Sequence, residues 1–277
     1  MGGWSYAQGY HVTASGDNSH AEGCETRATA NSCHAEGYLT EATAECAHAE
    51  GRRTLAYGKC QHVHGSSNVP DAKNQYLTIV GNGTKDNSAN AHTLHWSGQA
   101  WFAGAVTSSG ADYAEYFEWL DGNFMNEDRI GHIVALEGDK IRLAQAGDDY
   151  LGIVSGTATV IGDNAECEWH NKYLTDDYGR VIYEPVENTD GHEVYTTLAR
   201  KLNPDYDASK EYISRSERPE WATVGVFGKL YVNDDGTCTV NSYATVGTNG
   251  IATHSSEKTN MRVMKRINDN IVLVLMK

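Results

Sequence analysis

The segment from Asp112 to Asp128 concentrates side chains that could carry out acid–base chemistry. It holds six carboxylates before the first basic residue, and aromatic residues lie between them. Carboxylates that crowd together beside apolar rings raise one another's pKa, so that one can stay protonated while another accepts a proton. The hydrolysis of an amide bond requires such a pair. The six are Asp112, Glu115, Glu118, Asp121, Glu127 and Asp128.

Spacing suggests how the first three of these carboxylates are arranged. Asp112, Glu115 and Glu118 lie three residues apart, and a helix or tight turn would gather them on one face. Ser108 and Ser109 lie just upstream in a stretch of small residues, where a serine could act as a nucleophile or form the scissile bond. The alternative is a solvated acidic turn without a catalytic role.

A second candidate group is a column of histidines within a fourteen-residue repeat. Parallel strands about 4.8 Å apart would stack these rings. A closed metal site instead gathers three or four ligands around one point. We therefore expect this ladder to make hydrogen bonds between rungs or between chains, and to hold no metal. The ladder consists of His20, His34, His48 and His62, with Glu22, Glu36 and Glu50 beside it.

The repeat itself predicts the structure that positions these histidines. Glycines recur every fourteen residues from Gly9 to Gly65, and alanines form a second column from Ala14 to Ala56. Fourteen residues suit two short strands and two turns per rung, and stacking the rungs creates the core. We therefore predict a parallel β-roll over residues 1–66. Because the interior of each rung is so small, several chains packed side by side would bury far more apolar surface than a single chain can.

Residues 67–110 are expected to form a β connector, with a strand over 76–80 and a hairpin over 90–104. Trp96, Trp101 and Phe102 in this hairpin are interpreted as an aromatic core between chains. The alternative is a carbohydrate-stacking patch.

Residues 111–277 are predicted to be mostly β. Turn residues indicate hairpins joining 133–136 to 140–143, 226–232 to 238–243 and 262–267 to 271–275, and 206–216 is expected to form one short helix. Four charged residues at the end of this helix and just beyond it include two arginines and two glutamates. This mixture indicates a salt-bridged surface or a salt-bridged cluster between chains. The alternative is that its arginines neutralise a carboxylate or bound anion. The four are Arg215, Glu217, Arg218 and Glu220.

Composition excludes several classes of partner. The net charge is −15, and residues 111–277 carry 28 acidic and 16 basic side chains. Such a chain cannot displace counterions from nucleic acid. The longest apolar run, 271–276, is too short for membrane insertion. The six cysteines contain no CxxC pair, which favours reduced thiols. Cys46 and Cys60 share a repeat column and are expected to pack as small apolar residues.

The Ser-His-Ala-Glu-Gly unit at 19–23 and its counterparts at 33–37 and 47–51 resemble the head repeats of trimeric autotransporter adhesins. They are more similar to the variant found in phage tail and appendage proteins. The segment 111–119, with Asp121-Gly-Asn123, resembles the opening of the peptidase G2 family of intramolecular-chaperone autoproteolytic domains. Further similar stretches extend this resemblance over 111–277. They are 148–155, 202–207, 215–221, 224–230, 234–238 and 250–253.

The resemblance implies the C-terminal part of a phage or prophage tail fibre, made in the bacterial host cytoplasm and carried on the virion. It implies a homotrimer with a left-handed β-roll, whose last domain guides assembly and then cleaves itself off. The family is classed among the glutamic-type peptidases, and the resemblance implies that each chain cleaves itself a single time. Carried over to this chain, it makes Asp112 and Glu115 the acid–base pair and places cleavage between Ser108 and Ser109, without a cofactor or metal.

Other interpretations of the sequence stay open. A serine-driven acyl shift at the same bond is an alternative mechanism. The chain could instead be a structural fibre tip, or one that binds a host-surface receptor, that never cleaves. A third interpretation is a metal- or glycan-binding module that uses the histidine ladder or Trp96 and Trp101.

Overall fold

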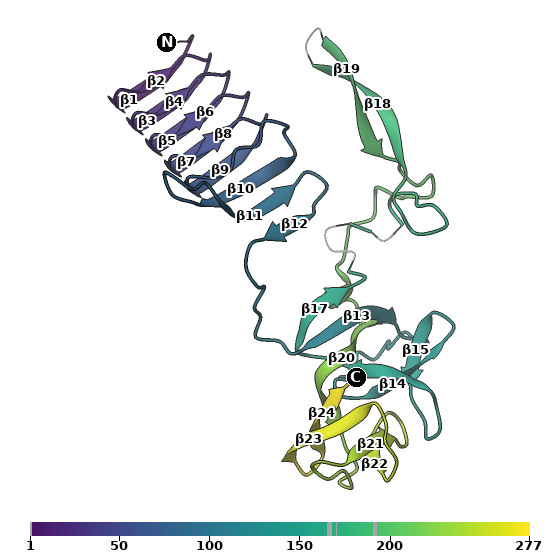
Figure 1. Ribbon diagram of the computed structural model, residues 1–277. Coiled ribbons are helices and arrows are strands. Elements are labelled where there is room, and N and C mark those ends of the chain that lie inside the picture. The colour runs from purple at the N-terminus through teal and green to yellow at the C-terminus, as the bar shows by residue number, and fades with distance from the viewer. Residues whose placement is uncertain (1, 165–167, 170, 191–192) are drawn as a thin grey trace. The chain divides into compact units, whose positions relative to one another are not determined.

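The computed structural model describes residues 2–164, 168–169, 171–190 and 193–277. The chain forms two compact units, Met1–Thr107 and Ser108–Lys277. Within the described residues the regular elements are strands and one short 3-10 turn, so the all-β prediction is confirmed (Figure 1). None of the helical structure in these residues is long and apolar enough to span a membrane.

The first unit is built around a solenoid, as the fourteen-residue repeat predicts (Figure 1). Strand residues of one rung pair in parallel with their equivalents fourteen positions later, as Ala21 does with Ala35. The rungs form two sheets. The longer strands are β1 (Tyr6–Tyr10), β3 (His20–Cys24), β5 (His34–Tyr38), β7 (His48–Arg52) and β9 (His62–Ser66), and the shorter ones are β2 (Thr13–Ala14), β4 (Arg27–Ala28), β6 (Glu41–Ala42) and β8 (Leu55–Ala56).

Two columns of the repeat explain how the rungs approach so closely. The alanine column from Ala14 to Ala56 is buried between the two sheets together with Ala21, Ala35 and Ala49, and Val63 and Ile79 close the same core. The glycine column has positive φ, with Gly37 at 108°. A β-carbon on Gly37 would lie 2.1 Å from the carbonyl oxygen of Gly51 in the next rung. Only glycine therefore fits the backbone spacing of the stack.

The connector continues the solenoid before it changes direction. β10 (Tyr76–Asn82) pairs in parallel with β9 and adds one more strand to the same sheet. β11 (Asn90–His95) and β12 (Ala100–Phe102) follow as antiparallel strands, which confirms the hairpin. Trp96, Trp101 and Phe102 are about half exposed in the single chain, so their burial between chains stays a prediction.

The second unit is organised around one long strand, β20 (Trp221–Asn233). The larger sheet has the order β15-β14-β16-β20-β24-β23-β21-β22, and β13 pairs with both β20 and β17. β18 and β19 form a separate hairpin. The bounds are β13 (Asp112–Glu118), β14 (Ile133–Glu137), β15 (Lys140–Leu143), β16 (Tyr150–Val154), β17 (Ala158–Gly162), β18 (Tyr183–Asp190), β19 (Glu193–Arg200), η1 (Arg215–Glu217), β21 (Tyr243–Val246), β22 (Ala252–Ser255), β23 (Met261–Asn268) and β24 (Ile271–Met276).

Two of the three predicted C-terminal hairpins are confirmed, β14 with β15 and β23 with β24. The hairpin of 226–232 with 238–243 is wrong, because β20 pairs instead with β24. After β20 the carboxylates of Asp234 and Asp235 accept backbone N–H groups of Cys238 and Thr237. These bonds fold the chain into a loop and leave no second strand to pair back.

The helix expected over 206–216 is also wrong, since only the 3-10 turn η1 forms there. The Asp207 carboxylate accepts hydrogen bonds from the backbone N–H and the hydroxyl of Ser209. The amide oxygen of Asn203 likewise accepts from the backbone N–H of Asp205. Such local bonds between side chain and backbone compete with helix formation.

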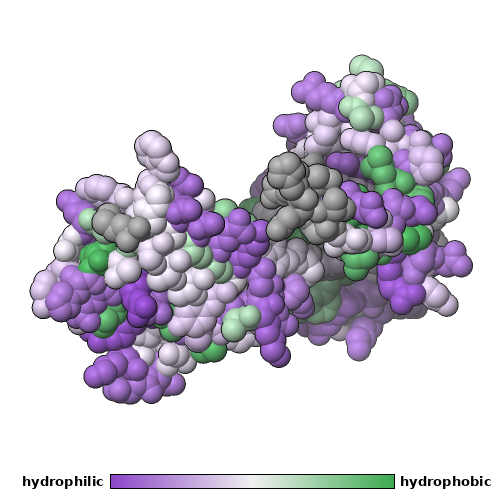
Figure 2. Space-filling model, turned by 90° about the horizontal axis from the view of Figure 1, so that it is seen from above, coloured by the Kyte–Doolittle hydropathy of each residue, from purple (hydrophilic) through white to green (hydrophobic). Residues whose placement is uncertain are grey.

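Burial in the second unit is divided between two apolar clusters. The larger contains Ile133, Leu230, Val263 and Val272, and the smaller centres on Trp119. Figure 2 shows one face of the whole chain, on which hydrophilic residues predominate and apolar residues are scattered. The strand that carries Asp112 and Glu115 packs against the smaller cluster through Phe117.

Candidate functional site

Asp112 and Glu115 lie on a strand, and the prediction of a helix or tight turn there is wrong. β13 pairs with β20 on one side and β17 on the other. Along a strand, successive side chains point to opposite faces, and burial along β13 alternates accordingly. Asp112 therefore shares the buried face with Ala114 and Tyr116, whereas Glu115 lies on the opposite face. A single chain does not bring the two carboxyl groups together.

Asp112 occupies a buried position, and the residues around it come from a segment that the local sequence does not reveal. Its side chain is 3% exposed, and the hydroxyl of Thr157 donates to Oδ1 at 3.4 Å. Burial raises the pKa of the Asp112 carboxyl, and the hydroxyls of Ser155 and Thr157 act in the opposite direction. A carboxyl group in such surroundings is suited to hold a proton and donate it.

Glycines on the neighbouring strand make room for Asp112. A β-carbon on Gly225 would lie 2.8 Å from Asp112 Oδ2. A β-carbon on Gly228, which has a φ of 116°, would lie 2.5 Å from the carbonyl oxygen of Ala111. The Gly225-Val-Phe-Gly228 spacing was visible in the sequence, but its significance depends on the pairing with β13.

Glu115 is partly exposed and is paired with a phenol. The hydroxyl of Tyr113, two residues earlier on the same face, donates to Glu115 Oε1 at 2.5 Å. This hydrogen bond raises the pKa of Tyr113. Gly162 of β17 again leaves space, because its β-carbon would lie 2.7 Å from the Tyr113 hydroxyl. The carboxylate is therefore held in place while it remains partly exposed to solvent.

Ser108 and Ser109 are exposed, and the chain is fixed immediately after them. The backbone N–H of Gly110 donates to Ser108 Oγ at 3.2 Å. The backbone of Ala111 is then hydrogen-bonded on both sides. Its N–H donates to the carbonyl oxygen of Thr157 at 3.3 Å, and its carbonyl oxygen accepts from the backbone N–H of Lys229 at 3.1 Å. Two exposed serines thus precede a tightly held strand.

A cavity of about 840 Å³ lies beside Thr157 and Ser155. Three arginines line it, and each has an acidic partner: Arg129 with Asp121 and Glu127, Arg215 with Asp163, and Arg218 with Glu220. Arg215 is 1% exposed and stacks on Trp221, with 3.8 Å between guanidinium carbon and ring centroid. The prediction of salt bridges at Arg215 and Arg218 is confirmed, but the surface position expected for Arg215 is wrong, because its side chain is buried. Because these arginines are ion-paired, the cavity gives no specific support to a bound anion.

The histidine ladder forms as the repeat predicts. The rings of His20, His34, His48 and His62 stack at centroid distances of 4.5, 4.6 and 4.7 Å. Among the described residues no hydrogen bond joins one ring to the next, and the polar contact between rungs within this column is the ion pair of Glu50 with His62, at 3.7 Å. Bonds between chains stay a prediction.

The cysteines contradict one expectation. Cys46 and Cys60 are exposed rather than packed inside, because their turn lies outside the alanine core. Cys24, Cys33 and Cys238 are also free thiols, and Cys167 lies outside the described residues.

Comparison with known proteins finds a family model that matches most of this chain. Residues 61–270 match the family model described as Peptidase_G2, IMC autoproteolytic cleavage domain. This match begins in the last rung of the solenoid, upstream of the resemblance seen in the sequence.

Several proteins share parts of this sequence. The pre-neck appendage protein of Bacillus phage B103 is 42% identical over 132 residues, which cover 48% of this chain and 15% of that protein. The putative phage-related protein YobO of Bacillus subtilis (strain 168) is 40% identical over 170 residues, covering 61% and 20%. The chain thus spans at most about a fifth of the length of these relatives.

A solved structure shares the fold. The crystal structure of the pre-mature bacteriophage phi29 gene product 12 covers 98% of this chain and 39% of that chain, with a TM-score of 0.68 and 23% identity. The family model matches well over half of the chain and includes the segment with Ser108, Ser109, Asp112 and Glu115. The chain therefore belongs to the Peptidase_G2 family of IMC autoproteolytic cleavage domains.

Proposed function

We propose that this chain is part of a phage tail appendage, whose second unit guides trimer assembly and then releases itself by one cleavage between Ser108 and Ser109. The observation that carries this proposal is the position of that bond. The first compact unit ends at Thr107 and the second begins at Ser108. Cleavage there would free the second unit with all of its strands intact.

The reaction is the addition of water to one peptide bond. A carboxylate takes a proton from the attacking water, while a carboxylic acid protonates the leaving nitrogen of Ser109 as the carbon–nitrogen bond breaks. The raised pKa of Asp112 fits the acid, and the more exposed Glu115 fits the base. The enzyme is then of the glutamic type and acts once, because the cleaved bond belongs to the chain itself.

Trimer formation offers a way to bring the two groups to one bond. In one chain they lie on opposite faces of β13, so a Glu115 from a neighbouring copy would have to complete the site. Cleavage would then await assembly. Repeated rungs with equivalent contacts give three chains little information about their mutual register, whereas a unit without repeats can supply it.

Intact-mass analysis of the purified chain tests the cleavage. We expect two fragments, one of which starts at Ser109. Asp112→Asn and Glu115→Ala should each leave the chain whole, whereas Glu118→Ala on the same strand should still cleave. A single chain of 30.3 kDa in a native trimer would instead favour a structural or host-binding fibre tip.

Mixed trimers test the shared site. When differently tagged Asp112→Asn and Glu115→Ala chains are expressed together, we expect cleavage to return in part, because each chain supplies the group that the other lacks. If the mixture stays whole while each wild-type control cleaves, the two groups do not complement between chains.

The acyl shift makes a different prediction. Its first step moves the Ser108 carbonyl carbon from the nitrogen to the hydroxyl of Ser109, and water then hydrolyses the ester. Ser109→Ala would abolish cleavage by that route, whereas the carboxylate mechanism tolerates it. Location on the virion, synthesis in the host cytoplasm and contact of the mature fibre with a host-surface receptor belong to the same proposal.

A further inference from the structure

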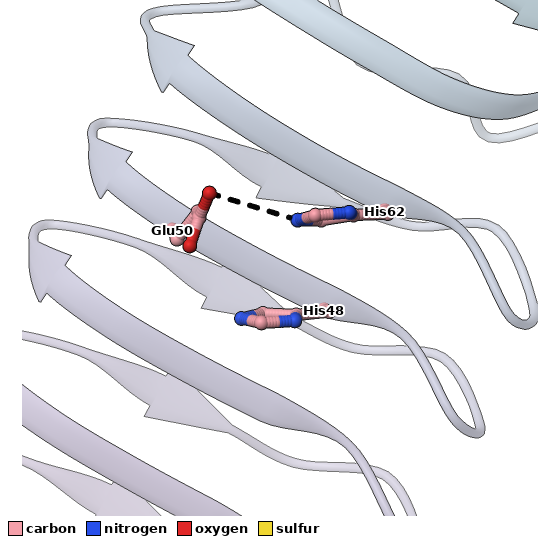
Figure 3. A group of neighbouring side chains, drawn as sticks. All are labelled: His48, Glu50 and His62. Carbon is pink, nitrogen blue, oxygen red and sulfur yellow. Dashed lines mark ion pairs between the residues drawn. The ribbon is translucent and has the colours of Figure 1, made fainter.

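The last step of the histidine ladder differs from the others. In two upstream rungs each histidine pairs with the glutamate of its own strand, His20 with Glu22 at 3.7 Å and His34 with Glu36 at 3.8 Å. Glu50 instead pairs with His62 of the following rung, with 3.7 Å between Oε1 and Nε2. The carboxylate therefore lies close to two successive imidazoles (Figure 3).

The sequence gives a reason for this difference. The glutamate column ends at Glu50, and the fourteen-residue spacing places His64 in the next position. His64 lies beside the ladder, with 5.4 Å between its ring centroid and that of His62. The end of the ladder thus collects three imidazoles and one carboxylate, a set of donors that suits divalent zinc, nickel or cobalt.

The geometry points to a transition-metal site formed by His48, Glu50 and His62, and we propose that it binds one divalent ion such as Zn²⁺ per chain. One nitrogen or oxygen atom from each of the three residues lies within 4.8 Å of the other two. The three come from the adjacent strands β7 and β9 and face the same side of the sheet (Figure 3). Three protein ligands leave a coordination position for water or for His64.

The ring nitrogens of the ladder are buried without hydrogen-bond partners. This holds for Nε2 of His20, His34, His48 and His62 in the part of the chain that the structure describes, but among these residues only His48 and His62 share a carboxylate, that of Glu50, with ligand atoms within 4.8 Å of one another. Buried polar atoms in native proteins are almost always satisfied. An ion would satisfy both nitrogens and the carboxylate together.

Binding requires a local adjustment. Ligands about 2.1 Å from a tetrahedral ion lie roughly 3.4 Å apart, so the three groups must close by about an ångström. The rings of His48 and His62 are now stacked with 16° between their planes and must tilt toward a common point. The side chains of His62 and Glu50 are 45% and 37% exposed, which leaves them room to rotate.

Metal titration of the full chain tests this site. The exposed thiols of Cys46 and Cys60 are first replaced by serine, so that they cannot bind the ion. We expect one Zn²⁺ or Co²⁺ per chain by equilibrium dialysis, and binding at least about tenfold weaker in His48→Gln and in His62→Gln. His20→Gln, from the same column outside the cluster, is the matched control and should bind as the parent does.

A second measurement does not depend on the variants folding. In the parent protein, Zn²⁺ should shift the imidazole NMR signals of His48 and His62 while leaving those of His20 in place. Absence of stoichiometric binding, or equal binding in all three variants, would overturn the proposal. The same holds if no ion binds and His48→Gln changes the oligomeric state, because the ladder would then contact a second copy of the chain.

Discussion

The two units of this protein position their residues by different means. In the solenoid each repeat strand contacts an equivalent strand fourteen residues away, and the column glycines and alanines lie against the same residue type in the next rung. In the second unit, Asp112 of β13 pairs with Gly228 of β20, more than a hundred residues later. A repeated fold can be recognised from the sequence because its contacts recur at a fixed spacing. A site for chemistry instead needs different groups brought together from distant segments.

Replacing a column glycine should produce the largest effect. In Gly37→Ala the new β-carbon would lie 2.1 Å from the Gly51 carbonyl oxygen, and backbone cannot move aside as a side chain can. We expect a loss of about 3 kcal/mol or more of stability in the solenoid. Hydrogen exchange measured by mass spectrometry should show faster exchange in β5 and β7.

The matched control for this substitution is Gly98→Ala. Gly98 has a φ of 86°, and a β-carbon there would meet nothing within 4 Å. The control isolates the conformational cost, about 1 kcal/mol. If both variants lose the same stability, close approach between rungs is not what the column requires.

A smaller effect is expected at Arg215, whose side chain is buried in the second unit. Arg215→Met removes the ion pair with Asp163 at 2.9 Å and the stacking on Trp221. Because Asp163 is half exposed, the loss should be about 2 kcal/mol, below that of a fully buried pair. Urea unfolding of the full chain measures it.

Arg180→Met provides the comparison in the same unit. Arg180 also pairs with an aspartate, at 2.7 Å, but its side chain is 76% exposed. Its removal should change the free energy of unfolding by less than about 0.5 kcal/mol. Equal losses in the two variants would show that burial of Arg215 does not matter.

Asp112 should give a smaller, pH-dependent effect. Its pKa is raised in the folded state, so its contribution to stability is present at low pH and is lost as the pH rises through the raised value. Asp112→Asn should remove this part of the pH dependence and gain stability relative to the parent as the pH rises. Urea titrations from pH 3 to 8 in a Glu115→Gln background check this. An unchanged pH profile would contradict the burial argument.

The smallest effect concerns the thiols. Burial raises the pKa of Cys238 strongly, whereas Cys46 and Cys60 are exposed. Under native conditions a thiol reagent should label Cys46 and Cys60 much faster than Cys238, without altering stability. Peptide mapping by mass spectrometry gives the order of labelling, and early modification of Cys238 would contradict it.

Much of the fold could be predicted because its signal is local and repeated. The columns from Gly9 to Gly65 define the rung, the register and the alanine core without any knowledge of distant contacts. Two C-terminal hairpins were legible for the same reason, since turn residues and strands lie together in the sequence. Where aspartates bind nearby backbone groups, as at Asp207 and Asp234, these local cues were misleading.

The sequence by itself determined the repeat, the all-β class and the family, because each is carried by residues close together in the chain. Only the tertiary structure decided which way the reactive groups face. Strand pairing with β17 and β20 places Asp112 and Glu115 on opposite faces, and the replacement of one column glutamate by His64 accompanies the turn of Glu50 toward His62. The orientation of a side chain depends on partners that the local sequence does not contain.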